Sequence, residues 1–415
     1  MHYTEADMPV LNDIGLLATC RDEGGQDAIH AIPEAALAWR GGEITWVGPA
    51  NALPSEYSDD KRIDAEGRLV VPGLIDCHTH LAFAGWRADE IEARMRGRTY
   101  QEIAAAGGGI ARTVAATRGA STDELIERCA RWLGAMARLG VTTVEAKSGY
   151  GLDLENEIRL LEVYESLQSA QPVRLVSTLL AAHVVPREYA GRRDKYVDLV
   201  CRQIIPSVAR RTLARFCDVF VEEGAFTPDE ARAILRCARE HGLGAKLHVD
   251  QLTDGGGAAL AAEMKAASAD HLECISADGV AQLARAGTVA VTLPLAALYV
   301  GHPTAPARTL IAAGVPVAVA TDFNPGTAPT FHLPLAMLLA ATLQRMTPPE
   351  VLKGVTMYAA RAIGEASTIG SLEPGKRADF AIIDAHDVNH WVYHFTPNSC
   401  VGTYIGGVEQ PAPRR

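Results

Sequence analysis

The sequence predicts an α/β protein, built as a (β/α)8 TIM-like barrel with a small β-sandwich domain formed by the N- and C-terminal segments. Two observations predict the barrel: eight short apolar runs alternate with helical segments between residues 70 and 365, and the helical segments carry start and stop signals. A third predicts the sandwich, since both ends of the chain contain short alternating runs instead. We therefore expect a composite sandwich from residues 1–69 and 366–415, and a barrel from residues 70–365.

The two ends of the chain share the character of a half-buried β structure. Residues 10–68 contain short alternating runs and a hairpin-like turn, AWRGGEITWVG. Residues 369–409 resume this style in the segments IGSLEPGKRADFAIIDAHD and CVGTYIGGVEQ. We expect these two β-rich pieces to pair into one small domain outside the barrel.

The strands predicted for the barrel are continuous apolar runs, which suit strands that are buried on both faces of a parallel sheet. In chain order these runs are LVVPGLIDCHTH, TTVEAKSG, VSTLLAAH, VFVEEGAF, KLHVDQ, SADHL, VAVTLP and VAVATDFN. Eight such strands with interleaved helices point to a closed barrel rather than an open sheet.

The segments between these runs carry helix signals. Thr227 and Glu230 have the spacing of a capping box, with Pro228 at the first helical position, and Gly242 stands where a helix C-terminus favours glycine. The segment 186–212 is longer than a crossover needs, and we interpret it as a helical insertion in the third βα loop.

Composition and charge exclude several classes of protein. The net charge of −11 argues against a nucleic-acid partner, for which a basic face is expected. No uninterrupted apolar stretch of about 18 residues is present, and the N-terminus lacks the basic start and apolar run of a signal peptide. The 8 cysteines are scattered without a CxxC pair, as in a reduced protein. We expect a cytoplasmic protein with no membrane partner.

The most informative motif is DCHTH, in which His78 and His80 end the first predicted strand. Side chains two apart on a strand point to the same side, so both imidazoles can reach one metal ion. An HxH pair alone is weak evidence, because two histidines on a strand are more often structural. Further candidate residues fall at the ends of other predicted strands: His183, His248, His271 and Asp322. Active sites of this fold are built at that end of the barrel, so we predict a metal centre there.

Several longer motifs make the chain similar to a known family. They are CHTHLAFAGWRADE, AGGGI, EAKSGYGL, AAHVVPREY, SADHL and TDFNPGT, and SGYGL and DFNPGT are far more specific than HxH. Together they resemble the imidazolonepropionase family of the amidohydrolase superfamily over nearly the whole chain. The resemblance implies metal-dependent hydrolysis of the cyclic amide C–N bond of 4-imidazolone-5-propanoate or a close analogue. The product is of the N-formimidoyl-glutamate type, as in histidine catabolism.

The resemblance also implies the residues of the site. The metal ligands implied are His78, His80, His248 and Asp322. The substrate-binding positions implied are Arg87, Tyr100, Tyr150, His183, Gln251, Asn324, Gly326 and Thr327. Among these, Arg87 is the arginine that binds the substrate's propanoate, because a planar guanidinium suits bidentate capture of a carboxylate. A small anionic substrate is therefore expected, and a homodimer is expected by resemblance alone.

One divalent metal ion is expected. Relatives with two ions bridge them through a carboxylated lysine on the fourth strand, where VFVEEGAF has none, and Lys147 on the second strand is not a substitute. Zinc fits nitrogen and oxygen ligands with an open position, and iron tolerates the same set.

The implied mechanism uses a water molecule activated by the metal, whose pKa falls to roughly 7. Asp322 accepts its proton and passes it to the leaving ring nitrogen. His183 is expected to polarise the ring carbonyl and His271 to support the nucleophile or the developing oxyanion, although these two roles can be exchanged.

The chain departs from the family's pattern at several pocket positions. The H-x-D-E motif after the fifth strand ends here in Gln251, at a substrate-contacting and catalytic position, and glutamine cannot take a proton. On the seventh strand, LPGTTFYL becomes LPLAALYV at residues 293–300. His332 and Tyr358 also replace other residues of the family. These changes make one side of the expected pocket more apolar.

Several functions therefore remain open beside the plain imidazolone. Loss of a carboxylate that pairs with a ring N–H suits an N-methylated imidazolone propanoate, because an N-methyl ring offers that carboxylate no donor. A hydantoin or thiohydantoin propanoate is a further alternative. A catalytically silent scaffold and a deaminase of the same superfamily are the readings from other classes, which metal analysis and ammonia release distinguish.

Overall fold

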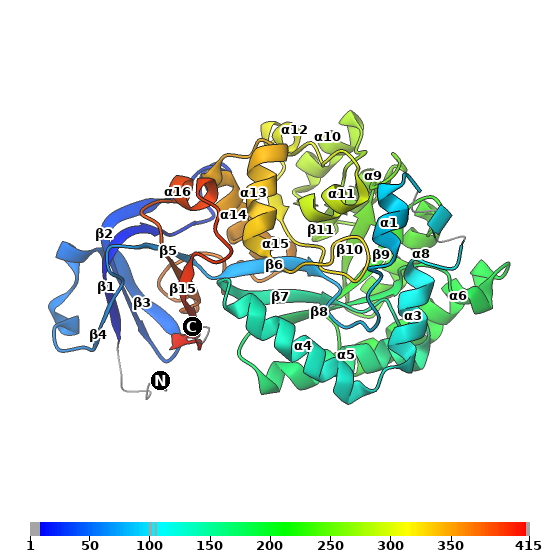
Figure 1. Cartoon of the computed structure of the whole chain (residues 1–415), viewed down its shortest axis with the longest axis horizontal. Coiled ribbons are helices and arrows are strands. Elements are labelled where there is room, and N and C mark those ends of the chain that lie inside the picture. The colour runs from blue at the N-terminus through cyan, green and yellow to red at the C-terminus, as the bar shows by residue number, and fades with distance from the viewer. Residues whose placement is uncertain (1–8, 99–101, 104–105, 412–415) are drawn as a thin grey trace.

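The computed structural model describes residues 9–98, 102–103 and 106–411, and it consists of a barrel with a β-rich body beside it (Figure 1). The barrel sheet has eight strands in the order β13-β12-β11-β10-β9-β8-β7-β6, and all of its neighbouring strands are parallel. Its strands are β6 (Leu74–Thr79), β7 (Val141–Lys147), β8 (Arg174–Ala182), β9 (Phe216–Val221), β10 (Gly244–Val249), β11 (Ser268–His271), β12 (Val289–Thr292) and β13 (Val317–Val319). The (β/α)8 barrel that the alternating runs predict is confirmed.

The barrel closes between its first strand and the segment that follows its last. Thr79 forms a parallel bridge with Phe323, and the amide of His80 donates to the Phe323 carbonyl at 2.8 Å. The amide of Asp322 in turn donates to the His78 carbonyl at 3.1 Å. Closure therefore brings the DCHTH and TDFN motifs side by side at the C-terminal ends of the strands.

Helices cover the outside of the barrel (Figure 1). Those up to residue 240 are α1 (Glu90–Met95), α3 (Ile110–Gly119), α4 (Thr122–Ala137), α5 (Leu154–Ala170), α6 (Arg193–Leu199), α7 (Ile205–Arg210) and α8 (Pro228–Glu240). Those that follow are α9 (Gly257–Glu263), α10 (Ala277–Ala286), α11 (Pro294–Val300), α12 (Ala307–Ala312), α13 (Leu333–Leu343), α14 (Pro348–Gly354), α15 (Met357–Ala362) and α16 (Val388–Tyr393). The predicted capping box of Thr227 and Glu230 is formed at the start of α8.

The interpretation of residues 186–212 as an insertion is wrong. A π-helical segment, Val200–Ile204, joins α6 directly to α7, and these turns are the helical connection between β8 and β9. Tyr196, Val200 and Ile204 are buried against the barrel core. The extra length is taken up by a loop and a short 3-10 turn before α6, so the segment is the crossover helix itself.

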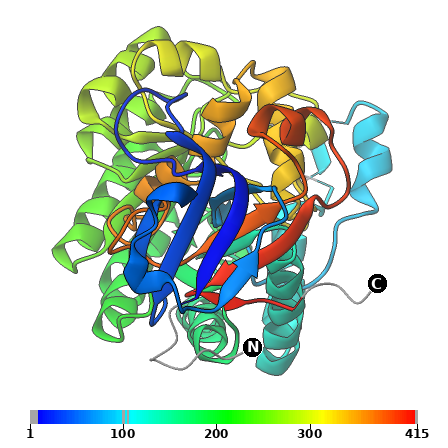
Figure 2. The same cartoon turned by 90° about the vertical axis from the view of Figure 1, so that its left-hand side faces the viewer.

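The ends of the chain form a second eight-stranded sheet, which faces the viewer in Figure 2. Its strands are β1 (Val10–Ala18), β2 (Ala31–Arg40), β3 (Glu43–Pro49), β4 (Arg62–Asp64), β5 (Leu69–Pro72), β14 (Phe380–Ile383), β15 (Cys400–Ile405) and β16 (Val408–Glu409). The main path runs β16-β15-β14-β5-β1-β2-β3, with β4 paired to β1. Segments from the two ends therefore pair directly, as predicted.

The terminal sheet curls over its own core to give the sandwich. Two strands separate β2 from β14 along the sheet, so a flat sheet would hold them about 14 Å apart. The ring of Trp39 in β2 nevertheless lies 5.2 Å from that of Phe380 in β14 and 5.9 Å from that of Tyr404 in β15. These rings fill a separate buried cluster.

The first predicted strand run is divided between the two sheets. Leu69–Pro72 is β5 of the terminal sheet, and only the residues from Leu74 onward belong to the barrel. Gly73 stands at the hand-over, where a Cβ would lie 2.3 Å from the Thr142 hydroxyl. Both halves are buried and apolar, so hydrophobicity alone does not mark the division.

Along the described part of the chain, no helix is long and apolar enough to cross a bilayer.

Candidate active site

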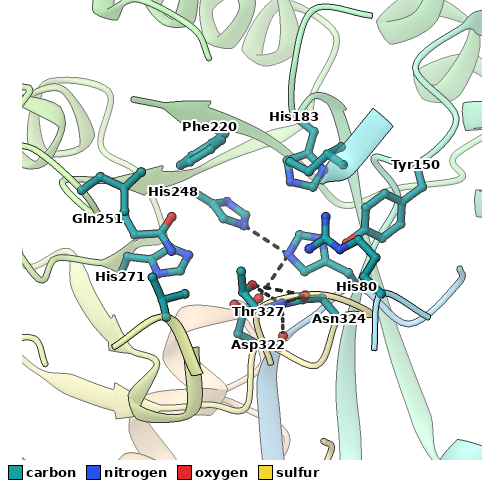
Figure 3. A pocket seen from close by; sticks show the side chains of 14 residues that line it. His80, Tyr150, His183, Phe220, His248, Gln251, His271, Asp322, Asn324 and Thr327 are labelled. Carbon is teal, nitrogen blue, oxygen red and sulfur yellow. Dashed lines mark hydrogen bonds and ion pairs between the residues drawn. The ribbon is translucent and has the colours of Figure 1, made fainter. Parts of the chain in front are cut away.

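Three of the four residues predicted to bind a metal, His80, His248 and Asp322, meet at the C-terminal mouth of the barrel (Figure 3), and His78 lies next to them. The Nε2 atom of His80 lies 3.4 Å from the Oδ1 atom of Asp322 and 3.4 Å from the Nε2 atom of His248. The Nε2 atom of His78 lies 3.5 Å from the same Asp322 oxygen. Ligand atoms of His78, His248 and His271 also fall within 4.8 Å of one another. Barrel closure thus brings four strand ends to one point.

This cluster suits a metal ion because the Nε2 lone pairs of its histidines point toward one another. The Nδ1 atoms of His78 and His248 face carboxylates, which places the imidazole protons there and leaves lone pairs on the Nε2 atoms. His78 Nε2 is buried with no hydrogen-bond partner in the described part of the chain. Burial also lowers the pKa of His78 well below its usual value, so its lone pair stays available. Lone pairs that converge in a buried site suit a cation.

Two carboxylates that the sequence analysis passed over orient these histidines. Asp270 in β11 lies 2.6 Å from His78 Nδ1, and Asp218 in β9 lies 3.0 Å from His248 Nδ1. Both are completely buried. Acidic residues within the apolar runs CDVFV and SADHL were the available signal, because a buried charge needs a partner. Carboxylate–histidine pairs of this kind fix the ring and tautomer of metal ligands.

Lys147, the lysine on the second barrel strand, is paired with two buried carboxylates. Its ammonium lies 2.7 Å from Asp218 and 2.8 Å from Glu145. Burial alone would lower the pKa of Lys147, but these two carboxylates outweigh burial and raise it. A lysine held as an ammonium cannot be carboxylated, so the expectation that it is no substitute agrees with its surroundings.

The metal cluster opens into a pocket at the mouth of the barrel. Its lining residues are His80, Arg87, Ile110, Tyr150, His183, Phe220, His248, Gln251, Leu252, His271, Val300, Asp322, Asn324 and Thr327. Most of the predicted substrate-binding residues are among them. Gly326 is not part of the lining but lies against Arg87, and Tyr100 falls outside the described residues.

Arg87 presents unused donors to this pocket. Its side chain is buried, and Nε and Nη1 make no hydrogen bond among the described residues. Its nearest anion is Glu90, 3.7 Å away, which is already held by Arg94 at 2.8 Å and by the Gly109 amide at 2.8 Å. A buried guanidinium with free donors is poised to bind an incoming carboxylate.

Only glycine fits at position 326, because the Arg87 guanidinium lies against it. A Cβ at position 326 would lie 1.2 Å from the Arg87 Nη2 atom. We expect Gly326→Ala to displace the guanidinium and to raise KM for an anionic substrate by about 10-fold or more, since truncated or misplaced charge contacts cost about 2 kcal/mol. Steady-state kinetics measure this. Gly119→Ala, at an exposed position with open space for a Cβ and no positive φ, controls for the loss of a glycine. An unchanged KM in Gly326→Ala contradicts the prediction.

The SGYGL loop is folded around a buried acid. Glu157 accepts hydrogen bonds from the amides of Gly151 and Leu152, each at 2.8 Å, and from that of Gly149 at 3.1 Å. This holds Tyr150 against His80 and His183, at ring distances of 5.8 and 5.5 Å. Glu157 is thus the reason that this loop reaches the pocket in a fixed shape.

The NPGT turn uses its asparagine internally. The Oδ1 atom of Asn324 accepts from the amides of Gly326 and Thr327 at 2.8 and 2.7 Å. Its Nδ2 atom donates to the Asp322 carbonyl at 2.7 Å. Asn324 therefore shapes the loop that carries Asp322 and lies against Arg87.

The two remaining histidines differ electrostatically. His183 places Nδ1 3.0 Å from the Gly149 carbonyl, and burial lowers its pKa well below the usual value. Burial acts the same way on His271, but Glu273, 3.6 Å from its Nδ1, raises the pKa of His271 overall. His183 is a neutral ring whose Nε2 accepts a hydrogen bond, whereas His271 holds a proton more readily.

The departures from the family's pattern do not all reach the pocket. Gln251 lines it, and its side chain has no hydrogen-bond partner in the part of the chain that the structure describes. Residues 295–297 are buried in α11 outside the lining, which takes only Val300 from that helix. His332 caps α13, and Tyr358 packs on Lys353. The expected apolar wall is therefore wrong at residues 295–297.

Comparisons with known proteins agree with this geometry. The model of the Amidohydrolase family matches residues 69–409. The imidazolonepropionase of Geobacillus thermodenitrificans is 50% identical over 370 residues, which cover 88% of this chain and 87% of the relative. The imidazolonepropionase of Porphyromonas gingivalis is 43% identical over 405 residues, which cover 96% of each chain.

Solved structures show the same fold at low identity. An atrazine chlorohydrolase variant from Arthrobacter aurescens matches with a TM-score of 0.76 at 17% identity, over 97% of this chain and 95% of the other. The ochratoxinase of A. niger matches with a TM-score of 0.72 at 19% identity, over 99% and 97%. The chain therefore belongs to the amidohydrolase family and, within it, groups with the imidazolonepropionases.

Proposed function

We propose that this protein hydrolyses the cyclic amide C–N bond of 4-imidazolone-5-propanoate, giving an N-formimidoyl-glutamate-type product in histidine catabolism. One observation carries the proposal: a single pocket holds both a metal-binding cluster and the unused donors of buried Arg87. The first suits hydrolysis of an amide, and the second suits a substrate that carries a carboxylate. The relatives named imidazolonepropionase support the same reaction.

The metal centre is proposed to hold one divalent ion, zinc by its nitrogen and oxygen donors, with iron also fitting. His78, His80, His248 and Asp322 are the proposed ligands. When bound, such an ion supplies Lewis acidity, which makes water a nucleophile near neutral pH. The ammonium of Lys147 argues against a second, lysine-bridged ion.

Proton transfer is assigned to Asp322. Its oxygen lies within 3.5 Å of two histidines, and its carboxylate opens into the pocket. Burial raises the pKa of Asp322, but the hydrogen bond from His80 and the nearby charges of His80, His271 and His248 together outweigh burial and lower the pKa, so the group starts as a carboxylate. It takes a proton from water and delivers it to the ring nitrogen as the C–N bond breaks.

We propose that His271 supports the developing oxyanion and that His183 contacts the ring nitrogen instead of polarising the carbonyl. His271 is the better donor, because Glu273 favours its protonated form, and we assign it to the developing oxyanion. His183 is neutral with its Nδ1 turned to Gly149, so we assign it to accept a hydrogen bond from a ring N–H. Gln251 donates or accepts a hydrogen bond to the ring and holds no proton.

Because Gln251 is neutral, two alternative substrates are also proposed: an N-methylated imidazolone propanoate and a (thio)hydantoin propanoate. A methyl group needs no acceptor, and Phe220 and Leu252 line the pocket with Gln251.

We further propose a cytoplasmic homodimer that acts on a small anion. The resemblance supports the dimer, and the net charge of −11 argues against nucleic acid.

The test compares the turnover of different ring substrates by one preparation of metal-loaded protein. We expect loss of ring absorbance with 4-imidazolone-5-propanoate, loss of activity after chelation, and recovery with Zn²⁺ or Fe²⁺. A higher kcat/KM for an N-methyl ring would transfer the assignment to that substrate. Metal-loaded protein that turns over none of these rings would be a scaffold, and ammonia release would identify a deaminase.

A further inference from the structure

A layer of buried charges lies inside the barrel below the histidine cluster. Glu145 and Lys147 stand two apart on β7, so both point into the barrel, and Lys246 stands two before His248 on β10. Asp218 and Asp270 come from β9 and β11. The side chains of Glu145, Lys147, Lys246, Asp218 and Asp270 are all 0% exposed.

Lys147 stands at the centre of this layer. Its Nζ atom lies 2.7 Å from Asp218 Oδ2, 2.8 Å from Glu145 Oε1 and 3.5 Å from Asp270 Oδ2. The same two aspartates contact the metal-binding histidines, Asp218 at His248 Nδ1 and Asp270 at His78 Nδ1. One ammonium therefore joins the supports of histidines on two different strands.

We propose that Lys147 is a positioning residue for the metal centre. Its charge holds the carboxylates of Asp218 and Asp270 in place, and each carboxylate then fixes the ring of its histidine with the proton on Nδ1. The Nε2 lone pairs of His78 and His248 are thereby aimed at one point before any ion arrives. The inference rests on the proposed metal ligands, but it concerns ion affinity and makes no use of turnover.

The second buried lysine provides a matched comparison. Lys246 is equally buried, yet its ion pair is to Glu145 at 3.5 Å, and it donates to the Ala362 carbonyl at 3.2 Å. Among the described residues, Lys246 forms no ion pair with Asp218 or Asp270. Replacing either lysine removes one buried cation, but only Lys147 joins the two histidine supports.

The arrangement predicts that replacing Lys147 with an apolar residue weakens metal binding. Asp218 faces His248 on one side and Lys147 on the other, so removal of the ammonium leaves its carboxylate with a single partner. A buried carboxylate that loses its cation partner turns toward other donors. It then no longer holds the His248 ring in place, and supports of this kind are worth about 10- to 100-fold in metal affinity.

The experiment measures Zn²⁺ affinity by competition with a chromogenic chelator in Lys147→Met and Lys246→Met. We expect affinity about 10- to 100-fold lower in Lys147→Met and within about threefold of the parent in Lys246→Met. The d–d absorption of the Co²⁺-loaded protein should change in Lys147→Met alone, because the ligand geometry shifts. Equal loss in both variants, or parental affinity and spectrum in Lys147→Met, overturns the proposal.

A double variant guards against simple misfolding. Lys147→Met with Asp218→Asn removes a buried cation and a buried anion together, so its thermal stability should exceed that of Lys147→Met. Asparagine still accepts a hydrogen bond from His248, but its amide is not held by an ammonium. Higher thermal stability of the double variant shows that unpaired buried charge, and not a general failure to fold, accompanies the weaker Zn²⁺ binding of Lys147→Met. Parental Zn²⁺ binding in the folded double variant overturns the proposal. Failure of the proposed function would appear separately, as absent turnover in fully metal-loaded parent protein.

Discussion

Asp322→Asn is expected to lower kcat by about 10²- to 10⁴-fold, the range that a positioned acid–base group contributes. Asparagine keeps the size of the side chain and its hydrogen bonds, but it cannot take a proton from water. The Asp322 oxygen contacts both His78 and His80, so metal content must be measured with the kinetics. Steady-state kinetics on protein with a full complement of metal isolates the proton-transfer role.

The control for this substitution is Asp384→Asn. Asp384 is an exposed aspartate that pairs with Arg68 in the terminal sheet, far along the chain from the pocket residues. Its variant should retain parental kcat. If Asp322→Asn keeps its metal and retains kcat within about threefold, another residue performs the proton transfer, and the proposed role of Asp322 is wrong.

Arg87→Met is expected to lower kcat/KM by about 30-fold to several thousandfold, equivalent to the 2–5 kcal/mol lost when a desolvated charge pair loses one partner. Most of the effect should fall on KM, because the propanoate is remote from the bond that breaks. Arg87→Lys should recover only part of it, since an ammonium keeps the charge but lacks the planar fork.

A neutral substrate analogue supplies the decisive comparison. With the propanoate replaced by its carboxamide, parent and Arg87→Met should be similarly slow, because the guanidinium no longer has an anion to bind. A variant that remains impaired to the same degree on this analogue would show that Arg87 supports the pocket in another way, for instance through the Gly326 loop.

The barrel could be predicted from the sequence because its strands are continuous apolar runs with signals for helix ends between them. Hydrophobicity did not predict where the terminal sheet ends and the barrel begins, because the strands on both sides are equally apolar. Leu69–Pro72 and the barrel strand after Gly73 are equally buried, so the boundary depends on partners that lie about 300 residues away in the chain. The crossover of α6 and α7 was taken for an insertion because its length, not its packing, was visible.

The site was predictable where residue type and strand position coincide, as for His78, His80 and His248. The supporting charges were harder to find. Asp218, Asp270 and Lys147 acquire their meaning only from neighbours on other strands, which the order of residues along one strand does not reveal. The apolar change at residues 295–297 suggested a pocket wall, but the turn of α11 directs those residues into the core.

The pairing of β5 with β14 has a consequence for synthesis of the chain. β5 is complete by Pro72, but the strand that covers its second edge begins at Phe380, and the first barrel strand likewise waits for Phe323. Until those segments leave the ribosome, unpaired strand edges and the apolar face around Trp39 stay open to other chains. The barrel sheet is thus completed only after Phe323 has been synthesised and the terminal sheet only after Phe380, so a product that stops before Phe380 should be a substrate for chaperones and proteases.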